Sequence, residues 1–144
     1  MLQPTRLLLI AGAGAITIAV AALFFTVTIH ATSLLYPVLV ITLFAAGAGV
    51  GSVHLAPTSP TRRSSQLSVA AFAAGMTAAT LAFAVYAHFG SLAIEDPRHR
   101  VVWPMFAVLF IATILLGLAA FSAATIVTSA IVKHRRSNGR ETAI

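Results

Sequence analysis

Long runs of apolar residues alternate with short polar stretches along the whole chain. The four runs cover 7–29, 34–53, 67–87 and 105–132, and every charged residue lies outside them. A helix needs about 20 apolar residues to cross the hydrocarbon of a bilayer. The pattern therefore predicts an all-α fold, an integral membrane four-helix transmembrane bundle that forms a single domain over 1–144. Because helices joined by short connections alternate in direction, we expect two helical hairpins.

Proline and polar residues predict where these helices begin and end. Pro37 and Pro104 lie near the starts of the second and fourth runs, where a missing backbone N–H is not needed. The fourth run holds about 28 residues, which at about 1.5 Å per residue makes about 42 Å against about 30 Å of hydrocarbon. This helix is expected either to tilt or to project into the cytoplasm. We expect the tail from Asn138 to be frayed.

The side of the membrane on which each end lies follows from the positions of Lys and Arg. If the helices alternate in direction, one face holds seven of the nine basic residues, and the other holds Arg98 and Arg100. The seven are Arg6, Arg62, Arg63, Lys133, Arg135, Arg136 and Arg140. Since basic loops stay in the cytoplasm, both termini are predicted to be cytoplasmic, in a multi-pass protein of the cell membrane, plasma or inner. Tyr36, Tyr86 and Trp103 would mark the external interface.

The charge balance and the lack of cysteine narrow the function classes. The net charge is +6, but the basic residues lie beside apolar runs without interleaved aromatic residues, so no nucleic-acid partner is expected. With no cysteine, the chain has no disulfide, thiolate metal site, iron–sulfur cluster or covalently attached haem. The partners that remain are the lipid bilayer and other membrane protein subunits, including further copies of the chain in a homo-oligomer.

Small residues recur at helical spacing in the first three runs. The stripes are Ala11, Ala15 and Ala19; Gly47 and Gly51, with Gly49 beside them; and Ala71, Gly75 and Ala79. In lipid no hydrophobic force draws helices together, so close approach of backbones at small residues provides the packing energy. We interpret the stripes as helix-packing faces, either within the bundle or toward a partner subunit.

The predicted spans contain no Asp, Glu, Lys or Arg. Ion-coupled carriers and proton pumps need such a group within the membrane, so neither class fits a chain acting alone. Threonines supply most of the polar groups in the spans, and their hydroxyls are expected to bond the preceding helical turn. These include Thr17, Thr42, Thr77, Thr80 and Thr113. A passive pore formed by several copies stays open as an alternative.

Histidines near the helix ends are the candidate ligands for a cofactor. His30 and His88 hold equivalent places in a His-x-x-Ser-Leu pattern that follows both the first and the third helix, as an internal duplication would produce. Two neutral imidazoles could hold a haem iron, and His99 with Glu95 and Asp96 would make a divalent-metal patch on the outer face. The alternative is that the imidazoles anchor helix ends at the interface. We weigh anchoring above ligation, so no cofactor is predicted.

A basic cluster is predicted on the cytoplasmic face. It comprises Arg62, Arg63, Lys133, Arg135 and Arg136. Anionic headgroups attract such residues by about 1 kcal/mol each, so the cluster is expected to set the topology. The alternative is that the basic cluster contacts an acidic partner protein.

No spacing of residues points to catalysis. The sequence has neither a Glu-x-x-His nor a His-Glu-x-x-His motif and no nucleophile elbow, so an enzyme is not expected. The leading hypothesis is a non-catalytic accessory, structural or assembly subunit of a larger membrane complex. The alternatives are an oligomeric channel or transporter component and, third, a haem-, quinone- or metal-binding redox subunit.

Overall fold

The computed structural model describes residues 4–28, 35–55, 62–93 and 102–143. They form four helices, α1 (Pro4–Thr28), α2 (Leu35–His54), α3 (Arg62–Ala93) and α4 (Val102–Glu141). All four helices are long and apolar enough to cross a membrane, which confirms the number and type of elements that the apolar runs predict.

Several helix ends lie beyond the ends of the apolar runs. Helix α3 already begins at Arg62, and α4 continues to Glu141. The tail from Asn138, which the sequence predicts to be frayed, continues α4 as far as Glu141, and the Thr142 N–H donates to the Asn138 carbonyl oxygen at 3.3 Å to close one more turn. At the start of α1, the Arg6 side chain donates to the carbonyl oxygen of Leu55, so the beginning of α1 lies beside the end of α2.

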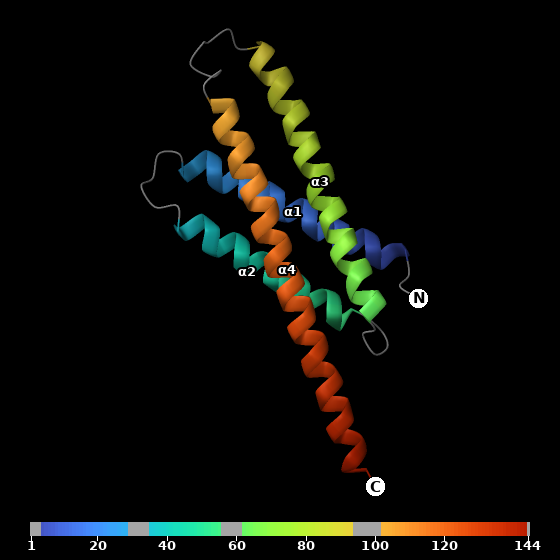
Figure 1. The fold of residues 1–144 in the computed structure, drawn as a ribbon. Coiled ribbons are helices and arrows are strands. Elements are labelled where there is room, and N and C mark those ends of the chain that lie inside the picture. Colours follow the sequence, from blue (N-terminus) through green and yellow to red (C-terminus); the bar gives the residue numbers. More distant parts are fainter. Residues whose placement is uncertain (1–3, 29–34, 56–61, 94–101, 144) are drawn as a thin grey trace.

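The helices pack mainly across the two halves of the chain. The most extensive contacts join α1 with α3 and α2 with α4, whereas α1 with α2 and α3 with α4 meet through smaller contacts. Figure 1 shows α1 and α2 running obliquely across α3 and α4. The strongest packing thus joins helices that are two places apart in the chain, which the hairpin prediction did not anticipate.

An aromatic stack between α3 and α4 forms the centre of the bundle. The rings of Phe72 and Phe121 lie 15° from parallel with their centroids 4.0 Å apart, and both side chains are fully buried. Ile18 from α1, Ala45 from α2 and Met76 from α3 belong to the same buried cluster. The stack therefore lies where all four helices meet.

Glycines allow helices to approach backbone to backbone. A Cβ atom on Gly75 of α3 would overlap the backbone of Ala11 in α1, and one on Gly14 would overlap the backbone of Phe72. A Cβ on Gly49 of α2 would lie 2.8 Å from the carbonyl oxygen of Phe121 in α4. Only glycine fits contacts this short, and such contacts are the usual mode of helix association in lipid.

Threonines within the spans direct their hydroxyls back into their own helices. Each donates to the backbone carbonyl oxygen four residues earlier, at 2.7 to 2.9 Å, in Thr17, Thr42, Thr77, Thr80 and Thr113. This confirms the expectation that these groups bond the preceding turn rather than line a path. Many large apolar side chains also face outward, among them Leu23, Leu43 and Leu115, and in a bilayer they would meet hydrocarbon of the same polarity.

Candidate functional site: a groove between α3 and α4

A groove opens between the first half of α3 and the second half of α4. Its volume is about 940 Å³, which compares with about 300–1,000 Å³ for small-molecule sites in general. Ala70, Ala73 and Ala130 line it with small side chains, and α3 contacts α4 less than it contacts α1. The space is therefore left by small residues on two helices that are each packed more closely on another helix.

Helical periodicity places the lining residues on one face of each helix. On α4 they include Leu118, Ser122, Thr125, Ser129 and Lys133. On α3 they include Arg62, Gln66, Val69 and Ala73. Residues three or four positions apart share a helix face, so each helix presents a continuous strip to the groove.

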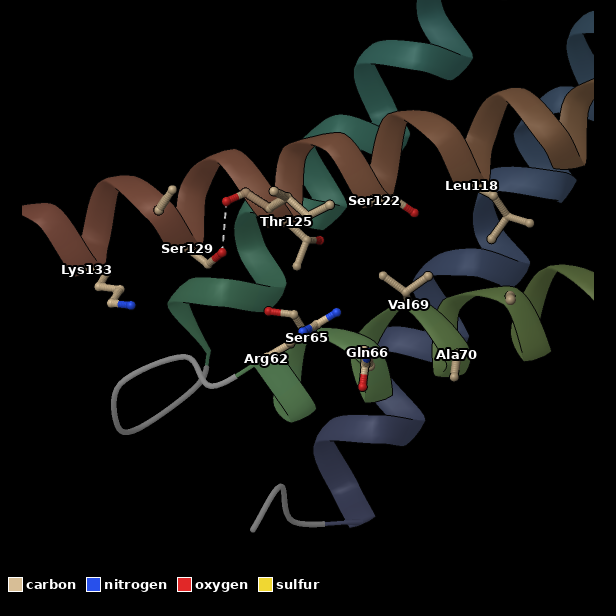
Figure 2. A pocket seen from close by; sticks show the side chains of 13 residues that line it. Arg62, Ser65, Gln66, Val69, Ala70, Leu118, Ser122, Thr125, Ser129 and Lys133 are labelled. Carbon is tan, nitrogen blue, oxygen red and sulfur yellow. Dashed lines mark hydrogen bonds between the residues drawn. The ribbon is translucent and has the colours of Figure 1, made fainter.

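The groove changes from charged to apolar along its length. Arg62 and Lys133 lie at the same end of the groove, and Leu118 lies toward the other end (Figure 2). Ser65 and Ser129 lie near the charged end, one on each wall. This order of charged, polar and apolar side chains resembles the order of layers in one leaflet of a bilayer.

Two hydroxyls of the α4 wall are held by their own helix. The Thr125 hydroxyl donates to the carbonyl oxygen of Phe121 at 2.8 Å. The Ser129 hydroxyl donates to the carbonyl oxygen of Ile126, also at 2.8 Å (Figure 2). A hydroxyl has one hydrogen to donate, so these two offer acceptors only. Donors for an anion in the groove must therefore come from other lining residues, among them Arg62, Lys133 and Gln66.

The charged end of the groove is positive. Arg62 and Lys133 are both exposed, and of the described residues none that lines the groove is acidic. Arg62 is also the first residue of α3, where the helix dipole adds positive potential. This end of the groove therefore attracts anions.

The predicted basic cluster is divided by the fold. Arg62 and Lys133 line the same groove although they come from different helices, whereas Arg63, Arg135 and Arg136 are exposed and lie outside its lining. A cluster that looks uniform along the sequence thus contains a pair of groove residues and a separate set on the surface.

The predicted stripes of α1 and α3 meet at one point. Ala11 lies against Gly75, while Ala15 is half-buried and Ala19 is exposed. The buried small residue that α1 adds to this contact is Gly14, which the stripe does not contain. The contacting face of α1 is therefore rotated away from the alanine stripe.

The remaining stripe residues lie on different faces. Gly49 of α2 is buried against α4, whereas Gly47 and Gly51 have nothing within 4 Å of their Cβ positions. On α3, Ala71 and Ala79 are partly buried and pack against the core. Of the three glycines in this segment of α2, one is therefore packed in the bundle, and the other two have free space at their Cβ positions.

The predicted outer-face ligands lie mostly outside the described residues. These are His30, Glu95, Asp96 and His99. His88 is described and exposed on α3, with its ring 6.0 Å from that of Phe89 in an edge-on arrangement. In the described part of the chain, no three His, Cys, Asp or Glu side chains gather as a metal site would require.

The polar lining of the groove was not assigned to any site from the sequence. Ser65 and Gln66 follow a basic connector, and Ser122 and Ser129 are spread over the last run. The usable signal is the spacing of Ser122, Ser129 and Lys133, which places them on one helix face. That α3 supplies the opposite wall becomes evident only in the folded chain.

Comparison with known proteins gave no match to a family profile, to a curated protein or to a solved structure. The class of the protein is defined by its fold. Four helices that are each long and apolar enough to cross a membrane fit a multi-pass membrane protein.

Proposed function

We propose that this protein is a non-catalytic subunit of a membrane complex and that it contacts its partner through the C-terminal end of α4. The supporting observation is the length of α4, which has 40 residues where α2 has 20. Figure 1 shows this end of α4 projecting beyond the other helices. Every described residue from Lys133 to Ala143 is exposed.

The length of α4 exceeds what a bilayer requires. Its 40 residues make about 60 Å at about 1.5 Å per residue, against about 40–45 Å for a bilayer with its headgroups. At an average tilt of about 20°, the helix still extends about 56 Å along the membrane normal. The last two or three turns then stand clear of the headgroups, within reach of a protein.

The projecting turns are basic and already helical. They hold Arg135, Arg136 and Arg140, with Glu141 as the only acidic residue of the helix. An acidic surface on the partner would complement them, and a preformed helix loses little conformational entropy when it binds. The absence of Asp, Glu, Lys and Arg from the four apolar runs supports a role without ion coupling.

The test is affinity purification of the tagged full chain from its native membranes in mild detergent. The variant replaces three arginines, Arg135→Gln, Arg136→Gln and Arg140→Gln. We expect a stoichiometric membrane partner to copurify with the wild-type chain and to be lost from this variant. Binding should also weaken with added salt, since exposed charge pairs are screened.

The matched control keeps the charge and changes the side chain, with lysine at the same three positions. This variant should retain most of the partner, because an exposed electrostatic contact depends mainly on charge. A wild-type chain that purifies alone contradicts the proposal. So does a partner that the glutamine variant retains in full.

A further inference from the structure

We propose that the groove between α3 and α4 binds one anionic phospholipid, with the phosphate held between Arg62 and Lys133 and an acyl chain lying along the apolar part of the groove. This site is separate from the projecting end of α4, because Arg135, Arg136 and Arg140 do not line the groove. The lipid site and the proposed partner contact can therefore be tested separately, and failure of one does not imply failure of the other.

Charge is the first reason for this occupant. Arg62 and Lys133 bring two cations to one end of the groove, and no acidic residue is among the described residues that line it. Basic pockets between transmembrane helices on the cytoplasmic side bind anionic headgroups. The apolar side chains of a partner helix would not pair with two cations at the end of the groove. The charge therefore favours an anionic lipid over an apolar helix as the occupant.

The dimensions of the groove are the second reason. On α4 its lining runs from Leu118 to Lys133, and on α3 from Arg62 to Ala73. At about 1.5 Å per residue these segments are about 22 Å and about 17 Å long. One leaflet with its headgroups is about 20–22 Å thick, half of the bilayer. The groove is thus as long as one lipid and does not extend across the membrane.

The order of side chains is the third reason. Beyond the cations, Gln66 has an amide N–H2 that can donate to the ester carbonyl oxygens of a lipid. Further along, Val69, Leu118 and Ile126 give the groove an apolar lining. A free phosphate would use only the charged end and would leave the apolar part without a ligand.

The binding test uses native mass spectrometry of the full chain after equilibration with vesicles of phosphatidylglycerol or of phosphatidylcholine. We expect the wild-type chain to retain one phosphatidylglycerol and much less phosphatidylcholine. Replacing both cations, Arg62→Gln with Lys133→Gln, should weaken retention about 30-fold, which is the combined effect of two residues near an anionic surface. Both side chains are exposed, so the variant should fold.

The matched control removes two equally exposed arginines outside the groove, Arg135→Gln with Arg136→Gln. For this control pair, the logarithm of the fold-change in phosphatidylglycerol retention should be less than a third of the value for the groove pair. Equal losses from the two pairs would overturn the proposal, because they would show diffuse surface attraction. Equal retention of the neutral and the anionic lipid would overturn it as well. If millimolar inorganic phosphate displaces the lipid, the site belongs to free anions and the lipid assignment fails.

A second measurement locates the acyl chain without relying on charge. The chain has no cysteine, so a single fluorescent label can be placed at Ala130→Cys in the groove or at Ile131→Cys, the next residue, which is turned about 100° around the helix and does not line the groove. Both positions are exposed. In detergent micelles with trace brominated phosphatidylglycerol, the groove label should be quenched at lower lipid concentration than the label at position 131. Equal quenching at the two positions would overturn the proposal. Crosslinking of position 130 to a stoichiometric protein partner in native membranes would overturn it as well.

Discussion

Gly14 of α1 lies so close to Phe72 of α3 that a Cβ atom on the glycine would overlap the backbone of the phenylalanine. The ring of the same Phe72 stacks on Phe121 of α4. One residue of α3 thus supports two helices, α1 through its backbone and α4 through its side chain. This arrangement makes the α1–α3 contact sensitive to a single methyl group.

Substitution of Gly14 by alanine should separate α1 from α3. We expect Gly14→Ala to destabilise the fold by about 1–3 kcal/mol, because the added methyl meets backbone that cannot rotate away. Gly12→Ala is the control in the same helix, since nothing lies within 4 Å of its Cβ position. It should change stability by no more than about 1 kcal/mol, toward a more stable helix. Unfolding by titration with dodecyl sulfate measures both, and equal effects would contradict the close approach.

Removal of one ring of the aromatic stack should be more damaging than removal of an exposed ring. Phe121→Ala is expected to cost about 3–5 kcal/mol, because it leaves a cavity where four helices meet. Phe89→Ala removes a ring that is mostly exposed and should cost no more than about 0.5 kcal/mol. The same titration compares the two variants. A small effect of Phe121→Ala would mean that the stack does not hold the bundle together.

Accessibility labelling should place both ends of the chain on one side of the membrane. The chain has no cysteine, so single cysteines at Thr5, Ser137 and His99 can be labelled without interference. We expect an impermeant maleimide to label position 99 in intact cells, and positions 5 and 137 only after permeabilisation, because basic ends stay in the cytoplasm. Labelling of positions 5 and 137 from opposite sides would refute the orientation.

The absorbance spectrum of the purified protein should show no Soret band if the protein is non-catalytic as proposed. The haem version of the redox alternative requires a haem iron between His30 and His88. A Soret band in the wild-type protein that disappears in the variant His30→Ala with His88→Ala would support that alternative against the proposed function. The single variant His54→Ala serves as the control, since this histidine lies at the end of α2.

The number of helices could be predicted from the sequence, because the ability of a segment to cross hydrocarbon depends only on its own residues. Any window of about 20 residues must be free of charge to cross hydrocarbon, and each window can be judged alone. The hydrogen bonds of the threonines were accessible for the same reason, since Thr17 and its acceptor on Ala13 belong to one helical turn. The length of α4 was underestimated, because its last turns are polar and the apolar pattern ends before the helix does.

The choice of contacting faces was decided only by the tertiary structure. In water an apolar stripe marks the buried side of a helix, but in lipid both sides are apolar and the stripe disappears. The sequence therefore could not show that α1 packs through Gly14 rather than Ala19, or that α2 packs through Gly49 rather than Gly47. The pairing of Arg62 with Lys133 at one groove likewise depends on how two helices from different parts of the chain come together.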